Sequence, residues 1–395
     1  MLTTSVDGLL PAIRSQHSLR SMASKCKASD AMSKNSSFLP LHVIGAGSIG
    51  LLYASKIHGA YCKSNIDTSQ HPVTLLMRPL HKPHLIRNGT DQDQENLLNA
   101  PVTLVSDNER TTCEIPVEII GHNCSEQSAI KTLLLCTKAN DACAALSSIW
   151  DRLDPSVTCM QPRIIILSNG ALAIKDAIAK NFPSADVEII YGSTTHGVFT
   201  NSNDSDRHCI HHAGNGSTFC TAGDFVRVCE ESGLNGYKMS PMSMKVMLWK
   251  KLAVNCVANP LSAIHNVRNG ELAGLQYDGQ DISATMTRII EEVSAVAVRE
   301  IESEYTQRPE ETRESIEAAR VELSVPSLQL FVDEVLTSTA NNISSMLQDV
   351  RAKRVTEVQF LNGYVCRIAN EKYGIECPYT ASMCSEVEAL LKDKG

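Results

Sequence analysis

The stretch Leu41-His-Val-Ile-Gly-Ala-Gly-Ser-Ile-Gly50 is followed directly by Leu51-Leu-Tyr-Ala-Ser-Lys-Ile57. It predicts a short buried strand, a G-x-G-x-x-G turn and an apolar helix, which is the context in which this glycine pattern binds a dinucleotide. The first glycine allows the tight turn, the second lets the backbone approach a pyrophosphate, and the third permits close packing of the helix. The phosphates would rest on the helix N-terminus. The candidate cofactor-binding residues of this turn are Gly45, Ala46, Gly47, Ser48, Ile49 and Gly50.

The next predicted strand, Val73-Thr-Leu-Leu-Met-Arg78, ends in a basic residue. An enzyme that uses NAD usually places an acidic residue at this strand end to hold the ribose hydroxyls, whereas an arginine suits the 2′-phosphate of NADP. Arg78 therefore predicts NADPH as the cofactor. Asp67 has a nominally suitable spacing from the glycine turn, but it belongs to a polar insertion at residues 61 to 72 that precedes the strand, so we give it no role.

Two further apolar runs, at residues 131 to 138 and 163 to 170, are typical of parallel strands that are buried on both faces. Lys138 and Asn169 stand at the carboxyl ends of these strands, which is where ligands lie in a doubly wound sheet. On local evidence alone the first is equally well a solvated loop lysine, and the second part of an ordinary Asn-Gly turn. The pattern also predicts helices over residues 139 to 150 and 171 to 181, and a strand over residues 187 to 191.

The remainder of the first half is less regular. Residues 86 to 129 are polar, with strand-like pieces at 102 to 105 and 114 to 120. After Gly192-Ser-Thr-Thr-His-Gly197, alternation near residues 198 to 200, 208 to 212 and 217 to 221 predicts antiparallel strands that complete the sheet. The segment His208-Cys-Ile-His-His212 favours a strand with incidental histidines over a zinc site, because its apolar residues have period 2.

From about residue 241 the strand signals stop, and helical patterns continue to the end of the chain. We therefore expect an α/β protein with a leader at residues 1 to 40, a Rossmann-type NADPH-binding domain at residues 41 to 240, and an all-helical substrate domain at residues 241 to 395. A length of 395 residues agrees with two or three domains. The acidic, amphipathic segment 281 to 325 is expected to present its charged face to solvent.

The stretch Leu248-Trp-Lys-Lys-Leu-Ala-Val-Asn-Cys-Val-Ala-Asn-Pro260 predicts a buried helix that stops at Pro260, because proline cannot continue the helical hydrogen-bond ladder. Its polar residues Lys251, Asn255 and Asn259 fall within an arc of about 80° on one face. A buried ammonium or amide is costly unless it is paired. Two interpretations remain: a structural amide ladder with a snorkelling lysine, or a lysine held over a pocket with two amides that orient an oxygen-rich ligand.

The composition excludes several classes of protein. The net charge of -8 and the pI near 5.9 give no basic footprint for nucleic acid. No apolar run approaches the roughly 20 residues that a membrane helix requires. The 14 cysteines form no C-x-x-C pair, which indicates a reducing compartment. The leader at residues 1 to 40 is rich in serine and basic residues, so we expect a cytoplasmic protein, or a mitochondrial one if the leader is a presequence.

Taken together, several motifs closely resemble the ketopantoate reductase (2-dehydropantoate 2-reductase) family. Besides the glycine turn and the strand ends, they are Trp249-Lys-Lys-Leu-Ala-Val-Asn-Cys-Val-Ala-Asn-Pro260, Arg268-Asn-Gly-Glu-Leu272, Asn341-Asn-Ile-Ser-Ser-Met-Leu-Gln-Asp349 and Thr356-Glu357. The resemblance covers about residues 41 to 385. The chain departs from shorter bacterial members in its leader and in the insertions near residues 61 to 70 and 86 to 128.

The resemblance implies a role for each matching residue. Lys251 would donate the proton to the ketone oxygen, with Glu357 beside it. The residues implied in binding the 2-oxo acid substrate are Lys251, Asn255, Asn259, Asn269, Ser345 and Asn169. Those implied in contacting NADPH or organising the site around it are Lys138, Asn169, Gly197 and Glu357.

The chemistry is consistent with these roles. Hydride transfer to the substrate C2 leaves a developing alkoxide, which an ammonium can stabilise and protonate. Burial should lower the pKa of Lys251, and the carboxylate of Glu357 should offset that effect. The alternatives are a β-hydroxyacid dehydrogenase, which also uses Lys-x-x-x-Asn, and a non-catalytic NADPH sensor on the same fold. The long helices could bury a dimer seam, so a homodimer stays an open expectation.

Overall fold

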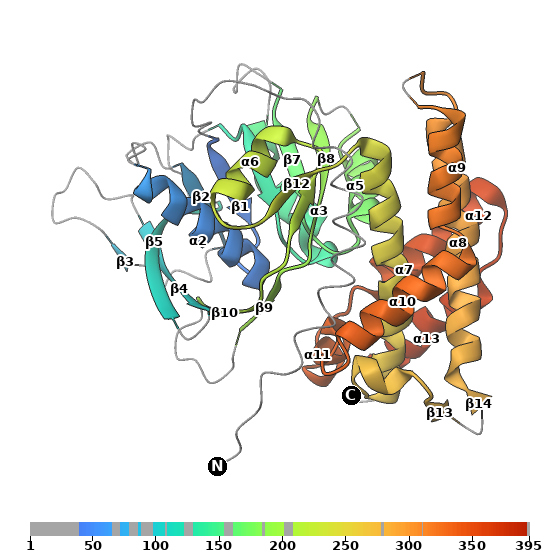
Figure 1. Cartoon of the computed structure of the whole chain (residues 1–395). Coiled ribbons are helices and arrows are strands. Elements are labelled where there is room, and N and C mark those ends of the chain that lie inside the picture. Colours follow the sequence, from blue (N-terminus) through green and yellow to red (C-terminus); the bar gives the residue numbers. More distant parts are fainter. Residues whose placement is uncertain are drawn as a thin grey trace, which may run out of the picture. The chain divides into compact units, whose positions relative to one another are not determined.

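The computed structural model describes residues 39–64, 72–78, 86–87, 98–106, 109–121, 129–153, 161–183, 186–200, 208–277, 280–309 and 311–392. The expectation for the leader, apart from its last two residues, and the discounted Asp67 lie outside these ranges. Among the described residues, contacts between Cα atoms separate a unit that ends at Met239 from a unit that begins at Ser240. The first contains the sheet and the second contains the long helices (Figure 1).

A parallel sheet forms the centre of the first unit. Its strands follow the order β8-β7-β6-β1-β2-β5, and each neighbouring pair in this run is parallel. The strands are β1 (Leu41–Ile44), β2 (Val73–Met77), β5 (Glu109–Ile119), β6 (Thr132–Leu135), β7 (Arg163–Ile166) and β8 (Glu188–Thr194). Every residue of β1, β2 and β6 is buried, as a strand covered on both faces requires. The predicted Rossmann-type architecture is confirmed.

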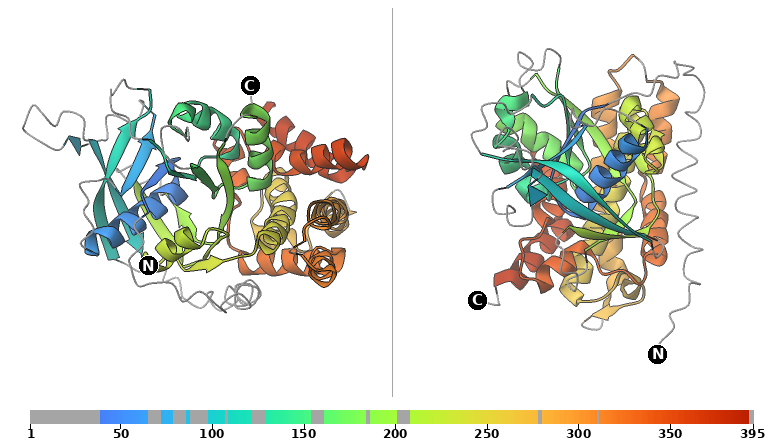
Figure 2. Two further views of the ribbon diagram at one scale, coloured as in Figure 1. Left: turned by 90° about the horizontal axis from the view of Figure 1, so that it is seen from above. Right: turned by 90° about the vertical axis from the view of Figure 1, so that its left-hand side faces the viewer.

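The rest of the sheet curls around helix α2 (Ser48–Lys63). The path continues from β5 through β4 (Leu98–Ser106) and β10 (Cys209–Gly214) to β9 (Gly197–Phe199). Because only two residues separate the end of β8 from the start of β9, the far end of the path must return to the neighbourhood of β8. Helix α2 contacts β2, β4, β5, β9 and β10, and it appears in blue against these strands (Figure 2). This enclosure explains why its residues are buried on nearly every side.

The remaining elements of this unit are three further strands of the sheet, of which β3 pairs with β4, and the shorter helices. The pair β11 and β8 is antiparallel, and β11 and β12 are parallel. These elements are β3 (Ile86–Arg87), α3 (Ala139–Ser147), η4 (Trp150–Leu153), α5 (Ala171–Asn181), β11 (Thr218–Cys220), α6 (Gly223–Glu231) and β12 (Gly236–Lys238). The sequence pattern predicted α3, α5 and β11, but it missed α6 and β12.

The second unit is helical, as predicted, apart from a small hairpin of two-residue strands. Helix α7 contacts α8, α9, α10, α11 and α13, so it forms the centre of this unit. The elements are α7 (Pro241–His265), η5 (Asn269–Leu272), β13 (Gln276–Tyr277), β14 (Gln280–Asp281), α8 (Ile282–Tyr305), α9 (Arg313–Glu322), α10 (Val325–Ser338), α11 (Ser345–Arg351), η6 (Val358–Phe360), α12 (Asn362–Tyr373) and α13 (Pro378–Lys392). Across the described ranges, no helix combines the length and apolar character that crossing a membrane requires.

The prediction that the central helix stops at Pro260 is wrong. Helix α7 continues through Pro260 to His265 and ends where Asn266 adopts a left-handed conformation, with φ of 57°. Proline has no N–H, so it leaves the carbonyl four residues earlier, that of Cys256, without a helical donor. The side-chain amide Nδ2 of Asn362 donates to this carbonyl at 2.9 Å and takes the place of the missing N–H. The helix can therefore pass the proline.

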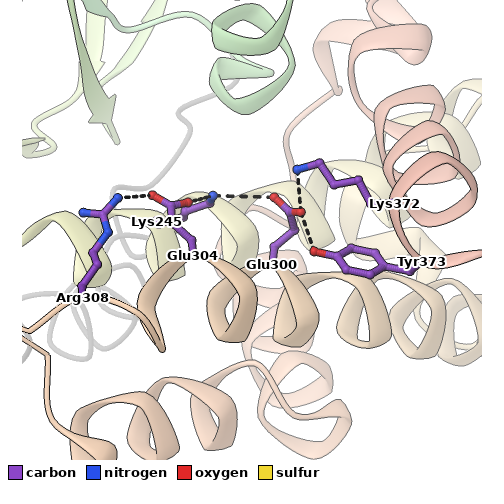
Figure 3. A network of polar contacts seen from close by, with 6 residues as sticks. All are labelled: Lys245, Glu300, Glu304, Arg308, Lys372 and Tyr373. Carbon is purple, nitrogen blue, oxygen red and sulfur yellow. Dashed lines mark hydrogen bonds and ion pairs between the residues drawn. The ribbon is translucent and has the colours of Figure 1, made fainter.

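The expectation that the acidic face of the segment 281 to 325 is simply solvated is also wrong at one position. Glu300 on α8 is only 5% exposed. Its Oε1 accepts hydrogen bonds from Lys372 at 2.8 Å and from the hydroxyl of Tyr373 at 2.7 Å, and its Oε2 lies 3.6 Å from Lys245 Nζ (Figure 3). Lys245 also pairs with Glu304. This charge network joins α7, α8 and α12.

Candidate active site

The three glycines of the turn after β1 have different surroundings. Gly45 has φ of +103°, and a Cβ there would lie 2.5 Å from the backbone of Cys136, which directly follows the neighbouring strand β6. A Cβ on Gly50 would lie 2.0 Å from the carbonyl oxygen of Gly45. Both positions are closed by the protein's own backbone. A Cβ on Gly47, by contrast, would meet no atom within 4 Å among the described residues. The backbone is therefore open to a ligand at Gly47 alone of the three.

The N-terminus of α2 is suited to bind an anion. Gly47 is the N-cap residue, and Ala46 precedes it while Ser48 and Ile49 begin the helix. In the described structure no side chain caps this helix, and its first turn carries no acidic residue. The first N–H groups of a helix have no partner within the helix, and their partial positive charge favours a phosphate. The turn thus has the composition and the open face that a pyrophosphate site needs.

The carboxyl ends of the central strands bring further predicted residues to the same edge. Lys138 follows β6 and is the N-cap residue of α3, and Asn169 follows β7 just before Gly170, which has φ of 68°. The hydroxyl of Ser168 lies 2.6 Å from the carbonyl oxygen of Thr137, so it links the two strand ends. Ser168 was not among the residues predicted from the sequence. The available signal was its position at a strand end, directly before Asn169.

Arg78 directly follows β2 and is exposed. Because β2 is parallel to β1 and adjacent to it, Arg78 lies on the edge that carries the glycine turn. An exposed arginine at this strand end is free to meet a phosphate on the adenosine ribose. The sheet therefore gathers Arg78, the glycine turn, Lys138 and Asn169 along one edge.

Gly197 begins β9, three residues after β8 ends on the same edge. It pairs closely with Gly214, since a Cβ on Gly197 would lie 3.3 Å from the Gly214 nitrogen. The residue before it, His196, is buried, and its Nδ1 accepts the N–H of Gly216 at 3.0 Å. Burial lowers the pKa of His196 to about 4, so the ring is neutral. Nε2 of His212, from the predicted histidine strand, lies 3.0 Å from the same Nδ1.

In the helical unit, the three neighbouring lysines of α7 have different environments. Lys245 is paired with Glu304, and Lys250 Nζ lies 3.6 Å from Glu322 and 4.8 Å from the ring centre of Phe331. Lys251 points about 100° around the helix axis from Lys250 and is only partly exposed. Only Lys251 therefore shares a face with the two asparagines.

Burial lowers the pKa of Lys251 and the nearby charge of Glu357 raises it, which leaves the value at about 8. The direction of both effects is the one expected from the sequence. Glu357 is only 8% exposed and directly precedes η6. A lysine with a pKa this close to neutral can be an ammonium at physiological pH and still release its proton readily. This is the property that a general acid needs.

Those predicted substrate residues that belong to the second unit lie on α7 or on α11 and η5, which contact it. Asn255 is partly exposed and Asn259 is 9% exposed. Ser345 is the first residue of α11 and is exposed. The preceding Ser344 caps α11, and its hydroxyl lies 2.6 Å from that of Ser262, one turn after Asn259 on α7. This contact fixes the start of α11 against α7, and it was not predictable from the local sequence pattern.

Asn269 has a structural contact of its own. Its Nδ2 donates to the hydroxyl of Thr339 at 2.9 Å, and its backbone N–H donates to the carbonyl of Asn342 at 3.1 Å. One of the two amide hydrogens of Nδ2 is thus used inside the protein, whereas the side-chain Oδ1 is buried and has no hydrogen-bond partner among the described residues.

Family models match both units of the chain. The model described as Ketopantoate reductase PanE/ApbA matches residues 41–224, and the model described as Ketopantoate reductase PanE/ApbA C terminal matches residues 243–391. A 2-dehydropantoate 2-reductase from Vibrio cholerae is 26% identical over 355 residues, which cover 88% of this chain and 96% of that protein.

Solved structures share the fold. The PanE/ApbA family ketopantoate reductase from Ralstonia eutropha superposes with a TM-score of 0.64 at 20% identity, covering 89% of this chain and 98% of its own. The ternary structure of D-mandelate dehydrogenase with NADH and anilino(oxo)acetate gives a TM-score of 0.61 at 20% identity, covering 89% and 99%. At such identities the likeness establishes the architecture, and the chemistry has to be argued from the residues.

Proposed function

The chain belongs to the ketopantoate reductase family of oxidoreductases, and from this premise we propose that it reduces 2-dehydropantoate (ketopantoate) to (R)-pantoate with NADPH, as a step of pantothenate and coenzyme A biosynthesis. The observation that carries the proposal is the state of Lys251. It lies on one helix face with two asparagines, and burial together with Glu357 brings its pKa to about 8.

In the proposed mechanism the bound nicotinamide supplies a hydride to the C2 carbonyl carbon of the substrate. Lys251 donates a proton to the carbonyl oxygen as negative charge develops there. Glu357 keeps this lysine in its ammonium form by favouring the charged state. The substrate would be held by Asn255, Asn259, Asn269, Ser345 and Asn169, whose amide and hydroxyl groups can donate to its carboxylate and carbonyl oxygens.

We assign the cofactor site to the edge of the sheet. The glycine turn, with Ala46, Ser48 and Ile49 around its open Gly47, would bind the pyrophosphate. Lys138, Asn169 and Gly197 would contact the nicotinamide half or shape the loops beside it. Two solved structures with this fold are of D-mandelate dehydrogenase with NADH, which supports a nicotinamide dinucleotide here. The preference for NADPH rests on Arg78.

The test is an assay of NADPH oxidation by the purified protein with ketopantoate and a panel of other 2-oxo acids. Benzoylformate, the oxo form of mandelate, belongs in the panel because a D-mandelate dehydrogenase shares the fold. We expect ketopantoate to give the highest kcat/KM. A clear preference for another 2-oxo acid would reject ketopantoate as the substrate, and NADP-dependent oxidation of a 3-hydroxy acid would favour the β-hydroxyacid dehydrogenase alternative.

The substrate contact proposed for Ser345 has its own test. Replacing Ser345 by alanine removes an exposed hydroxyl at the start of α11 and leaves the cap of that helix, Ser344, in place. We expect a higher KM for ketopantoate. Unchanged KM and kcat in the Ser345→Ala variant would remove this residue from the proposed substrate site.

We further propose a cytoplasmic location, or a mitochondrial one if residues 1 to 40 act as a presequence. A fluorescent reporter fused to these residues decides between the two. We also propose a homodimer, in which the long helices of the second unit would bury the dimer interface. Light scattering on the purified full chain measures its mass directly.

A further inference from the structure

Helix α7 depends on a donor from outside itself at the point where Pro260 interrupts its ladder. The amide Nδ2 of Asn362 donates to the carbonyl oxygen of Cys256 at 2.9 Å, across 106 residues of sequence. Asn362 is the first residue of α12 and is completely buried. The orientation of its amide is fixed by the partner, because a carbonyl oxygen can only accept a hydrogen bond.

This contact leaves a buried polar atom without compensation. The Oδ1 of Asn362 is buried and has no hydrogen-bond partner among the described residues. Such an atom destabilises a fold, because it has lost its hydration. An alanine at position 260 would give Cys256 its helical donor, and an apolar residue could then replace Asn362. The pair of Pro260 and Asn362 is therefore not the most stable way to build α7, and this points to a second role.

The second role is indicated by what else lies on the segment that contains Asn362. Glu357 is five residues earlier, and its carbonyl oxygen accepts the N–H groups of Phe360 at 2.9 Å and Leu361 at 3.1 Å, so residues 357 to 362 form a compact turn. Glu357 acts on Lys251 through its charge. The same two segments thus meet twice, at Lys251 with Glu357 and at Cys256 with Asn362.

We propose that Asn362 is a positioning residue for the reaction: by anchoring the turn 357–362 to the carbonyl of Cys256, it holds the carboxylate of Glu357 beside Lys251. The hydrogen bond fixes where this turn lies along α7. The spacing agrees on the two segments, because Lys251 and Cys256 are five residues apart on α7 and Glu357 and Asn362 are five residues apart on the other segment. The assignment rests on the proposed function only in taking Lys251 as the proton donor.

A purely structural role makes a different prediction. If Asn362 did no more than satisfy the Cys256 carbonyl, an alanine at position 260 would make it redundant, since the backbone N–H that alanine brings would pair with that carbonyl. If Asn362 also holds Glu357, the same change would restore the helix and leave the turn 357–362 without its anchor. The variants Asn362→Leu, Pro260→Ala and the double variant separate these two cases.

The experiment measures two quantities in each full-length variant. Urea unfolding gives the stability, and an NMR titration of lysines labelled with ¹³C at Cε gives the pKa of Lys251, with Lys251→Arg used to assign its signal. We expect Asn362→Leu to lower both the stability and the pKa of Lys251. In the double variant we expect the stability to recover, while the pKa of Lys251 stays below the wild-type value by roughly one unit, as the weakened influence of a neighbouring carboxylate would produce.

Two outcomes would overturn the inference: a wild-type Lys251 pKa in the double variant, or an unchanged pKa in a folded Asn362→Leu protein. The double variant keeps the test decisive if Asn362→Leu alone fails to fold, because it restores the backbone hydrogen bond. The titration needs no substrate. Inactivity of the wild-type protein towards ketopantoate would therefore refute the proposed function, but it would not change the conclusion that Asn362 controls the pKa of Lys251.

Discussion

Glu357 raises the pKa of Lys251 in opposition to the larger lowering effect of burial, and the balance is a value of about 8. An isolated lysine titrates near 10.4, so an unburied one would hold its proton too firmly to be an efficient acid at neutral pH. Burial alone would lower the pKa of Lys251 further, because it disfavours the charged form. The carboxylate keeps the residue charged at pH 7 while leaving the proton easy to transfer.

The first prediction concerns Lys251 itself. Replacing it by alanine should lower kcat by roughly 10²-fold to 10⁴-fold, as the loss of a general acid does, while NADPH binding changes little. Steady-state kinetics and a fluorescence titration with NADPH measure the two effects. The matched control is Lys250→Met, since Lys250 is the adjacent residue on another face, where it packs against Phe331. Near-normal kcat in Lys251→Ala would remove this residue from the mechanism.

The second prediction is a pH dependence. The proposed reaction needs the ammonium form of Lys251, so kcat/KM should fall as the pH rises through the pKa of this lysine, which is about 8. Glu357 raises that pKa, and Glu357→Gln should therefore move the alkaline limb to lower pH, by roughly one unit. Profiles of kcat/KM between pH 6 and 10 test this. An alkaline limb that stays in place would show that Glu357 does not act through Lys251.

The parallel core was predictable from the sequence because local pattern is sufficient there. The strands β1 and β6 are four-residue, largely apolar strands in which every residue is buried, and Gly45 and Gly50 allow a turn geometry that a side chain would block. The placement of Lys138 and Asn169 followed from the same rule, since carboxyl ends of adjacent parallel strands share an edge.

What the sequence could not provide depends on residues far apart. The proline rule is local, and it failed at Pro260 because Asn362 supplies the missing donor from a different helix. The acidic pattern of α8 likewise cannot reveal that Glu300 faces Lys245 and Lys372. The helix α6 carries a strong amphipathic pattern, but it is short and stands between strand signals, so periodicity alone did not separate it.

The third prediction separates the glycines of the turn. A methyl group on Gly50 would lie 2.0 Å from the carbonyl oxygen of Gly45, so Gly50→Ala must move backbone and should cost about 1–3 kcal/mol of stability. Gly47 has open space around it and a φ of -84°, so Gly47→Ala should cost less than about 1 kcal/mol, as an N-cap change does. Urea unfolding measures both.

The same pair should differ in cofactor binding. Because Gly47 is where the backbone is open to a pyrophosphate, Gly47→Ala should weaken NADPH binding in a protein that remains stable. A fluorescence titration with NADPH provides the measurement. Unimpaired NADPH affinity in Gly47→Ala would argue that the phosphates bind elsewhere.

The fourth prediction tests the cofactor preference. Arg78→Ala removes an exposed guanidinium at the end of β2, and a hydrogen bond to a charged group contributes about 1.5–3 kcal/mol. The affinity for NADPH should therefore fall by about 10-fold to 100-fold, whereas NADH, which has no 2′-phosphate, should bind as before. The ratio of the two dissociation constants provides the control within one protein. An equal loss for both cofactors would reject the assignment of Arg78 to the 2′-phosphate.

The last prediction concerns the charge network of Figure 3, in which Glu300 is nearly buried between Lys245, Lys372 and Tyr373. Burial raises the pKa of Glu300, but the hydrogen bonds from Lys372 and Tyr373 and the charge of Lys245 outweigh it, so the pKa is lowered. A carboxyl whose pKa is lower in the folded state stabilises the fold above the pKa of the unfolded chain, and this contribution is lost as the pH falls through the folded value.

Glu300→Gln should therefore cost about 3 kcal/mol at pH 7, because it leaves Lys245 partly unpaired, and it should also flatten the loss of stability of the wild type in acid. Urea unfolding between pH 3 and 7 measures both effects. The control is Glu291→Gln, since Glu291 pairs with Arg288 on the exposed side of the same helix and such pairs contribute less than about 1 kcal/mol. An equal loss of stability in the two variants would mean that the buried network stabilises the fold no more than an exposed ion pair does.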